Sequence, residues 1–194
     1  PGLKRDENLF AFPYDWRRDN RVAARRLAQQ SKQWLRDWRL KSRNPDAKLI
    51  IIAHSMGGLV ASYFADCLEG WREIHTLINI GVPFRGSANA LNFLTNGFGS
   101  FPLSGTLAGR GAFASMDSVY QLLPTYAFVA DGQKTVRVPE ASVPGVDPAR
   151  AKSAWDFHEE LTRARSRNRG LDGYERVIVR CVTGIRQPTG PSAV

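Results

Sequence analysis

The chain has 194 residues, of which 43% are hydrophobic and 10% aromatic, which is enough for one domain with a buried core. No segment is long and apolar enough to predict a membrane-spanning helix, and two cysteines exclude a disulfide-rich scaffold without indicating a compartment. The formal net charge of +9 favours anionic surfaces, but no basic run alternates with aromatic residues as a nucleic-acid-binding platform requires. We therefore expect no nucleic-acid partner and interpret most arginines as solvated residues on helix faces.

The first predicted elements are a strand, a long helix and a second strand. Residues Leu9–Arg17 are aromatic and apolar and predict a strand, with Pro13 marking its end or a bulge. An amphipathic helix is predicted from about Asn20 to Arg43. The apolar run Leu49–Ile52 has no polar alternation and predicts a strand buried on both faces. These three elements form a βαβ unit, so the two strands should be parallel.

A sharp turn joins the second strand to another predicted helix, which extends to about Leu68. The turn has the sequence Ala53-His54-Ser55-Met56-Gly57. A buried strand, a tight turn with small residues around a serine, and a helix are the context of a nucleophile elbow. Small residues two before and two after Ser55 would let the two backbones approach closely while the serine is held at a strained, exposed apex. The sequence therefore predicts that Ser55 is a nucleophile, beside free N–H groups at the start of the helix.

The second half of the chain continues the alternation of strands and helices. Its apolar runs predict a third strand, two helices and a fourth, buried strand, in this order: Ile74–Ile80, Ala88–Leu94, Pro148–Arg167 and Tyr174–Val182. Between the third and fourth strands, small residues, glycines and prolines dominate residues 95–147, apart from a short predicted helix at Met116–Leu123. This composition indicates an inserted cap or lid. Cys67 and Cys181 are expected to be buried free thiols. The whole pattern predicts an α/β fold, a parallel sheet flanked by helices, with chemistry at the carboxyl ends of the strands.

Four motifs then suggest a family, and they occur in this order: Tyr14-Asp15-Trp16-Arg17, Ala53-His54-Ser55-Met56-Gly57-Gly58, Ile80-Gly81-Val82-Pro83-Phe84-Arg85-Gly86-Ser87 and Leu122-Leu123-Pro124. Together they resemble the lecithin:cholesterol acyltransferase-like branch of the α/β-hydrolases, which includes phospholipid:diacylglycerol acyltransferases and bacterial lipase-like relatives. The similarity extends over about Leu9 to Thr189. It implies that Ser55 is the acylated nucleophile and that the backbone N–H of Met56 is an oxyanion donor.

The same resemblance implies the reaction. The full-length parent would transfer an acyl group from a lipid or other acyl ester to an alcohol, as an O-acyltransferase, or to water, as a lipase or esterase. The first motif has no triad role in the family, so we expect Asp15 and Arg17 to pair at the strand end and Trp16 to line the acyl pocket. The sequence contains no metal-ligand cluster and no phosphate-cradling loop, so it predicts no cofactor and no metal.

A hydrolase of this class also needs an acid and a histidine after the nucleophile. His54 is expected to pack near the elbow, His75 begins the third strand at the wrong end of the sheet, and His158 lies within a predicted helix. Asp131 lies in a segment that resembles the family's acid segment but precedes the fourth strand, so Asp131 with His158 is only an in-chain alternative.

The segment Cys181–Thr189 resembles the strand and turn that precede the family's acid segment. We therefore expect residues 1–194 to be a single partial α/β-hydrolase domain, a central fragment in which the early strands and the triad Asp and His are missing. Such a fragment should be inactive by itself.

Two other functions remain open from the sequence. A non-catalytic lipid-binding or interaction module could retain the hydrolase scaffold. The arginine face of the helix Asn20–Arg43, which includes Arg25 and Arg36, could also contact an anionic membrane surface.

Overall fold

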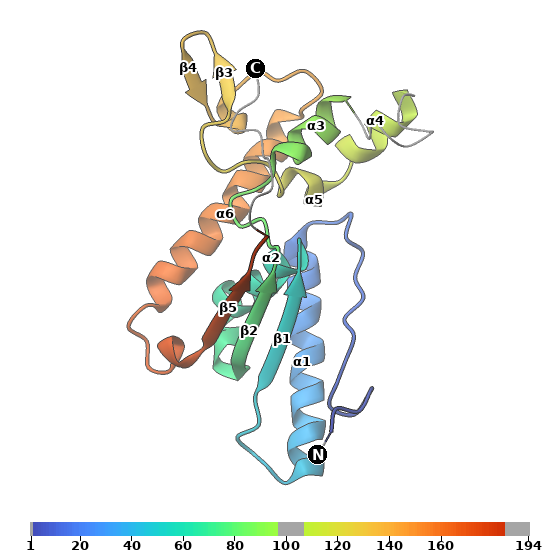
Figure 1. Cartoon of the computed structure of the whole chain (residues 1–194), viewed down its shortest axis with the longest axis vertical. Helices are drawn as coiled ribbons and strands as arrows, with labels where there is room; N and C mark the ends of the chain where they lie inside the picture. Colours follow the sequence, from blue (N-terminus) through green and yellow to red (C-terminus); the bar gives the residue numbers. More distant parts are fainter. Residues whose placement is uncertain (1, 97–106, 185–194) are drawn as a thin grey trace. The chain divides into compact units, whose positions relative to one another are not determined.

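The computed structural model describes residues 2–96 and 107–184 (Figure 1). These residues divide into two compact units. The described part of the first unit consists of 2–15, 21–82 and 163–183, and that of the second unit consists of 16–20, 83–96, 107–162 and 184. Within these residues, no helix combines the length and the apolar character needed to span a bilayer.

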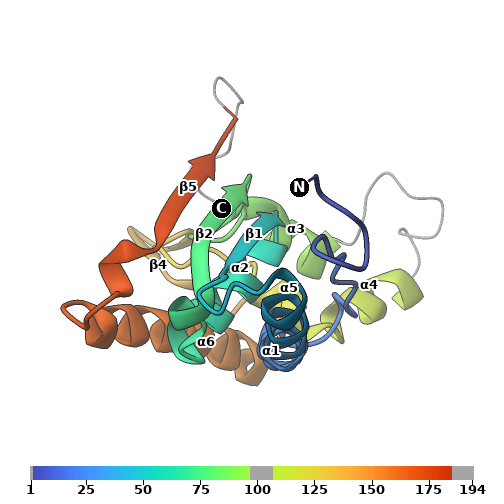
Figure 2. The same cartoon turned by 90° about the horizontal axis from the view of Figure 1, so that it is seen from below.

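The first unit is built on a three-stranded parallel sheet. Its strands are β1 (Leu49–His54), β2 (Ile74–Ile80) and β5 (Ile178–Val182), in the order β1-β2-β5. Figure 2 shows α1 (Asn20–Ser42) and α2 (Gly57–Ser62) on one side of this sheet. A π-helical turn, Tyr63–Cys67, follows α2 directly. The predicted parallel α/β architecture is confirmed, and the third predicted strand has the bounds that the sequence indicated.

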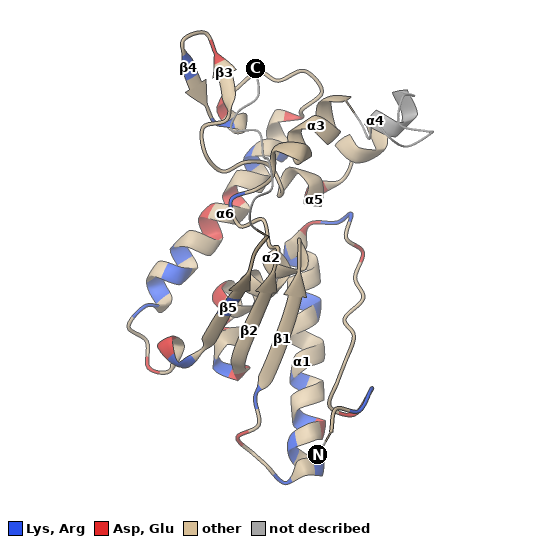
Figure 3. Ribbon diagram, in the orientation of Figure 1, with Lys and Arg blue, Asp and Glu red and all other residues tan. Residues whose placement is uncertain are grey.

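Helix α1 forms where the sequence predicted it, and its two sides differ in composition. Residues on one side are buried in the first unit, namely Ala23, Ala24, Leu27 and Leu35. Lys and Arg residues are distributed along the rest of the helix, as Figure 3 shows. The 3.6-residue period of the apolar residues explains both the helix and the side that it buries.

The prediction of a strand at Leu9–Arg17 is wrong. Its only ladder contact among the described residues is an isolated bridge between Arg5 and Leu9, so the predicted βαβ unit does not form there. The aromatic side chains stack instead, since the rings of Phe10 and Trp34 lie 4.6 Å apart at an interplanar angle of 6°. Pro13 also removes a backbone donor that a ladder would need. An apolar run therefore packs through its rings on α1, and β1 is left as an edge strand.

The predictions that Leu49–Ile52 is buried on both faces and that Tyr174–Val182 is a buried strand are also wrong. Ile50 and Ile52 are 65% and 67% exposed, while Ala53 is buried. All residues of β5 are exposed, including Cys181, and Cys67 is only partly buried, although neither cysteine forms a disulfide, as expected. His54 is exposed rather than packed beside the elbow. Nothing in the described part of the chain covers the side of β1 that carries Ile50 and Ile52, or either side of β5. Hydrophobicity alone therefore overestimated the burial of these strands.

A buried carboxylate connects three segments of the first unit. Asp66, in the π-helical turn, is 10% exposed at its side chain and accepts hydrogen bonds from Arg165 Nε and the Tyr174 hydroxyl, both at 2.8 Å. Asn168 Nδ2 donates to the backbone oxygen of Asp66 at 2.9 Å. Burial and the neighbouring Asp66 carboxylate raise the pKa of Tyr174 to about 12. These contacts hold the end of α6 (Pro148–Asn168) and the turn before β5 to the helix that follows the elbow.

The second unit contains the helices α3 (Ala88–Asn96), α4 (Leu107–Ala114) and α5 (Asp117–Tyr120), the first part of α6, and an antiparallel hairpin of β3 (Val129–Asp131) and β4 (Lys134–Val136). It has its own apolar core, formed by Ala90, Leu91, Leu94, Val119, Tyr120, Leu123, Phe128, Val138, Ala151 and Ala154. The described part of the predicted cap, residues 95–147, belongs to this unit. The predicted helix Met116–Leu123 is shorter than expected, and α4 and the hairpin were not predicted.

Candidate active site

Ser55 lies at the turn between β1 and α2, at the carboxyl end of the strand. Its backbone has φ +50°, in the left-handed region that residues with a side chain seldom adopt. The backbone N–H of Ser55 donates to the backbone oxygen of Ile80 at 2.9 Å. The backbone oxygen of Ser55 accepts a hydrogen bond from the N–H of Gly58 at 3.0 Å. The residue is exposed. The fold thus holds an accessible hydroxyl in a strained conformation, secured on one side by the end of β2 and on the other by the start of α2.

Close packing explains why two glycines follow Met56. A Cβ added at Gly58 would lie 2.5 Å from Val82 Cγ1 and closer still to Cγ2, so any side chain there would overlap with the end of the sheet. A Cβ at Gly57 would meet only the Tyr14 hydroxyl oxygen, at 3.8 Å. Gly58 therefore allows the helix and the sheet to approach at the elbow, whereas Gly57 is not required by space.

The short distance between Gly57 and the Tyr14 hydroxyl places Tyr14 beside the elbow. Its side chain is half-buried, and burial raises the pKa of its phenol, so the hydroxyl remains protonated at neutral pH. The sequence interpretation assigned roles to the three residues after Tyr14 and none to Tyr14 itself. Its position in the first motif was the only available signal, because nothing in the local sequence shows which residue of an extended segment faces a distant turn.

Met56 occupies the N-cap position of α2, with φ −57° and ψ −25°, and its side chain is buried. Its backbone oxygen accepts the N–H of Leu59 at 3.0 Å. Its own N–H forms no hydrogen bond with another described residue, so this donor is available beside Ser55. That is the position in which an oxyanion donor is needed.

The other residues of the first motif are divided between the units. Asp15 belongs to the first unit, whereas Trp16 and Arg17 belong to the second. All three are exposed, Trp16 by 49%. The pairing of Asp15 with Arg17 and the place of Trp16 in an acyl pocket therefore stay predictions.

The histidines of the chain have separate environments. His54 is exposed at the end of β1, and His75 Nδ1 lies 2.7 Å from Thr76 Oγ1 at the start of β2. His158 lies on α6, where its Nε2 donates to the backbone oxygen of Gln121 at 2.9 Å. Asp131 is exposed at the end of β3. Asp131 and His158 belong to the second unit and Ser55 to the first, so their assembly into a triad stays a prediction.

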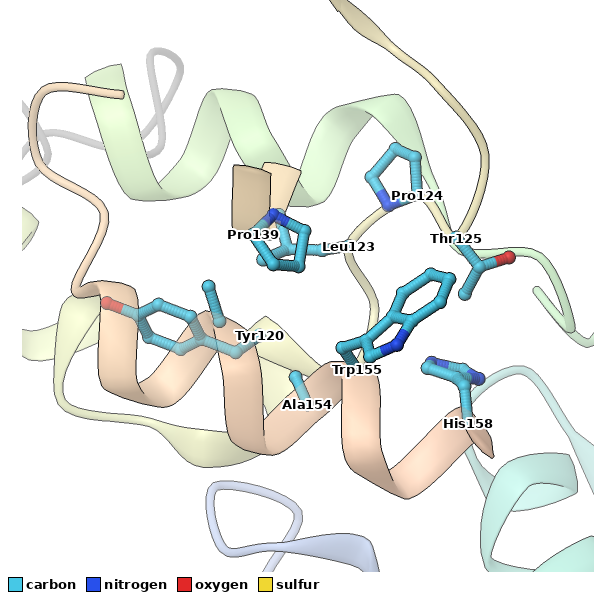
Figure 4. A pocket seen from close by; sticks show the side chains of 9 residues that line it. Tyr120, Leu123, Pro124, Thr125, Pro139, Ala154, Trp155 and His158 are labelled. Carbon is cyan, nitrogen blue, oxygen red and sulfur yellow. The ribbon is translucent and has the colours of Figure 1, made fainter. Parts of the chain in front are cut away.

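His158 also lines a small cavity within the second unit (Figure 4). The cavity has room for about one water molecule. Its walls are mainly apolar and come from α5, α6 and the segments after α5 and β4, with the residues Tyr120, Leu123, Pro124, Thr125, Pro139, Ala151, Ala154, Trp155 and His158. The guanidinium of Arg137 lies 5.1 Å from the ring centre of Trp155. Among the described residues, no group of three or more His, Cys, Asp or Glu side chains is placed to hold a metal ion.

Comparison with solved structures supports the fold. A chain from the crystal structure of the Tle4–Tli4 complex superposes with a TM-score of 0.61 at 18% sequence identity, over 77% of this chain and 41% of that chain. The three parallel strands, the turn at Ser55 and the flanking helices are thus a part of an α/β-hydrolase fold.

Sequence comparison identifies relatives among characterised proteins. The mouse (Mus musculus) lysosomal phospholipase A and acyltransferase is 29% identical over 133 residues, which are 63% of this chain and 30% of the relative. The rat (Rattus norvegicus) protein of the same name is 30% identical over 128 residues, with the same coverage. Phospholipase A(1) LCAT3 of Arabidopsis thaliana is 29% identical over 146 residues, which are 71% of this chain and 32% of the relative. The chain thus spans about a third of the length of these relatives.

The family model for lecithin:cholesterol acyltransferase matches residues 1–181, nearly the whole sequence. This match agrees with the ordered motifs around Tyr14, Ser55 and Pro83 and with the turn that presents Ser55. The chain belongs to the lecithin:cholesterol acyltransferase family.

Proposed function

We propose that the whole protein transfers acyl groups from lipid esters through a serine ester formed on Ser55. The observation that supports this most directly is the strained, exposed turn at Ser55 between β1 and α2, in a chain of this family. The relatives named phospholipase A and acyltransferase act on substrates of this class. With an alcohol as acceptor the protein would be an O-acyltransferase, and with water a lipase or esterase. Residues 95–147 would form a cap over the acyl site.

The proposed first step forms one bond and breaks another. Ser55 Oγ attacks the carbonyl carbon of the ester while a base removes the hydroxyl proton, and the Met56 N–H stabilises the tetrahedral oxyanion. As this intermediate collapses, the protonated base gives its proton to the leaving oxygen, the alcohol of the donor departs, and the acyl group stays on Ser55. An acceptor hydroxyl or water then attacks the acyl-enzyme and regenerates the serine. The whole protein would use a triad acid and histidine to activate Ser55, with His158 as the alternative base.

Replacement of the nucleophile tests this mechanism. In the whole protein, Ser55→Ala should lower turnover of p-nitrophenyl esters by about a thousand-fold or more, because no acyl-enzyme can form. Ser42→Ala, which removes a hydroxyl at the end of α1, should leave turnover unchanged and serves as the control. Equal activity of Ser55→Ala and the unmodified protein would contradict the proposal. Binding of lipid without any turnover by the unmodified protein would favour the non-catalytic module.

A fluorophosphonate probe tests whether the 194-residue chain contains a base that activates Ser55. The 194-residue chain should react only slowly with the probe, because we expect no imidazole to deprotonate Ser55 in it. Labelling can be followed by intact-mass spectrometry, with Ser55→Ala as the blank. Rapid labelling of Ser55 would show that the chain contains its own base, and loss of that labelling in His158→Ala would identify it.

A second proposal concerns contact with an anionic membrane. Arg25, Lys32 and Arg36 are exposed and lie within about 40° of one another around α1, so they form a continuous basic stripe. The exposed acidic residue of this helix, Asp37, lies about 100° away from the stripe around the helix axis, although its Oδ1 is 3.9 Å from Arg36 Nε. The formal net charge of +9 also favours binding to an anionic membrane.

Vesicle binding tests the basic stripe. Sedimentation with phosphatidylcholine vesicles that contain phosphatidylserine should fall steeply between 50 mM and 300 mM salt, because exposed charges are screened. Arg25→Glu/Arg36→Glu should abolish this binding at low salt. Lys134→Glu/Arg167→Glu makes the same change in net charge at exposed positions outside α1 and should retain most of it. Binding that does not depend on salt, or an equal loss in both double variants, would contradict the proposal.

A further inference from the structure

The segment that precedes α1 lies along this helix and positions Tyr14 (Figure 1). Three contacts join the segment to α1, in reverse order along the two: Glu7–Lys41, Phe10–Trp34 and Phe12–Arg26. The segment therefore runs antiparallel to α1, and Tyr14 lies towards the start of the helix. Its hydroxyl is also beside the elbow, so one extended segment connects α1 with the turn that presents Ser55.

The ring of Tyr14 is held by stacking. Its centre lies 5.9 Å from the ring centre of Phe12, at an interplanar angle of 21°. The guanidinium of Arg26 lies over Phe12, 5.7 Å from the ring centre. Because a tyrosine side chain has only about two torsion angles to fix, this packing sets the place of its hydroxyl before any substrate binds. Such preorganisation is what electrostatic catalysis requires of a hydrogen-bond donor.

The Tyr14 hydroxyl faces an open space at the elbow. It lies 3.8 Å from a Cβ built on Gly57, and no other described atom outside the helix backbone and the neighbours of Gly57 comes within 4 Å of that point. The hydrogen bond from the Gly58 N–H to the backbone oxygen of Ser55 closes a four-residue turn, whose ends lie within about 7 Å of each other. Ser55, Met56 and Gly57 belong to this turn. The hydroxyl of Tyr14 thus lies at the edge of the space beside Ser55.

This hydroxyl can donate to a bound molecule. It forms no hydrogen bond with another described residue, and the side chain is half-buried. Burial raises the pKa of the Tyr14 phenol, so the group keeps its proton at neutral pH. A neutral hydroxyl in a fixed position stabilises a negative charge that develops beside it, and the charge of an acyl transfer develops on the carbonyl oxygen next to Ser55.

We propose that Tyr14 is a further catalytic residue, whose hydroxyl donates a hydrogen bond to the oxyanion of the tetrahedral intermediate on Ser55. It acts together with the Met56 N–H, from the side of the turn that Gly57 leaves open. The proton stays on the phenol, because Tyr14 stabilises charge and transfers no proton. This inference rests on the proposed acyl transfer through Ser55.

The test compares tyrosine variants of the whole protein. Tyr14→Phe should lower kcat for p-nitrophenyl esters by about ten-fold or more and leave KM unchanged, because the oxyanion is absent from the bound ester. Its thermal unfolding midpoint should not fall, since the hydroxyl bonds to no other described residue. Tyr174→Phe is the matched control, because it removes a hydroxyl that donates to Asp66. This control should lower the unfolding midpoint and leave kcat unchanged.

A pair of inhibitors separates charge stabilisation from binding. A long-chain trifluoromethyl ketone adds to a serine nucleophile and then carries an oxyanion, whereas the corresponding alcohol cannot form this adduct. Tyr14→Phe should weaken inhibition by the ketone by the same factor as it lowers kcat/KM. Inhibition by the alcohol should be unchanged.

Three results would overturn the role of Tyr14. These are a loss of kcat smaller than about ten-fold, equal weakening of the ketone and the alcohol, and a lower unfolding midpoint in Tyr14→Phe. Ser55→Ala distinguishes these failures from failure of the proposed function. If Ser55→Ala is inactive and Tyr14→Phe is fully active, only the role of Tyr14 is excluded. Turnover that survives in Ser55→Ala, or no turnover by the unmodified protein, would exclude both.

Discussion

At the scale of single residues, Gly57 and Gly58 are adjacent in the sequence and have different roles in the fold. Both lie in the first turn of α2, where a glycine costs helix stability relative to alanine. Only at Gly58 would an added Cβ overlap with another side chain, the branched side chain of Val82. A motif of two glycines shows that small residues are present there, but the fold decides which one is required.

This difference can be measured. Gly58→Ala should lower the free energy of unfolding by about 1–3 kcal/mol, because the added methyl must displace a stiff β-branched side chain. Gly57→Ala should leave it unchanged or raise it by up to about 1 kcal/mol, because alanine favours the helix. Urea unfolding followed by circular dichroism compares the two. Destabilisation of the same size in both variants would mean that space at Val82 is not the cause.

At the scale of elements, the Asp66 contacts show how segments far apart in the sequence become one unit. Arg165 and Asn168 come from the end of α6 and Tyr174 from the turn before β5, about a hundred residues after Asp66. A buried carboxylate is stable only when such donors satisfy it. Local sequence predicts helices around Asp66 and Arg165 and a strand that begins at Tyr174, but it contains no sign that these segments share a hydrogen-bond network.

The raised pKa of Tyr174 predicts a dependence of stability on pH. Below about pH 10 the phenol is protonated in both the folded and the unfolded state, so Tyr174 adds no pH dependence there. Between pH 10 and the folded pKa of about 12, the unfolded chain loses the proton first, and the stability that Tyr174 contributes is lost as pH rises.

Tyr174→Phe should therefore have a shallower fall in its thermal unfolding midpoint over this range than the unmodified chain. It should also be less stable near neutral pH, by about 1 kcal/mol, because the hydrogen bond to Asp66 is absent. Other titrating groups are common to both proteins and cancel in the comparison. Parallel curves from pH 9 to 12 would show that the pKa of Tyr174 is not shifted by folding.

At the scale of the whole molecule, net charge and the exposed apolar side chains of the sheet have opposite effects on solubility. The chain has 27 Lys and Arg residues against 18 Asp and Glu residues, and this excess keeps copies apart at neutral pH. The isoelectric point is about 10.1, so the repulsion disappears as the pH approaches this value. The exposed side chains of Ile50, Ile52 and Val182 are then no longer opposed by charge.

We expect aggregation to rise between pH 7 and pH 10. Static light scattering at fixed concentration should increase over this range. Ile52→Arg should remain clear closer to pH 10, because it places a permanent charge among the exposed apolar side chains of the sheet. Leu40→Arg adds the same charge on α1 and should improve solubility less. Scattering that stays constant with pH, or equal improvement by both variants, would exclude the exposed side of β1 as the site of association.

Elements whose signals are local could be predicted from the sequence alone. The period of apolar residues predicts α1 and α6, the continuous run Ile74–Ile80 predicts β2, and the small residues around Ser55 predict the turn that presents it. Contacts between near neighbours in the chain set these features, so a single sequence is sufficient for them. The ordered motifs extend the same reasoning to the family.

Where each element packs became known from the three-dimensional fold. Leu9–Arg17 stays out of the sheet because its rings stack on α1, and Ile50 is exposed while Ala53 is buried on the same strand. The fold also places Tyr14 beside the elbow and lets Asp66 accept a hydrogen bond from Arg165 at the end of α6. The physical reason is that burial depends on which distant segments cover a residue, and its own hydrophobicity does not specify them.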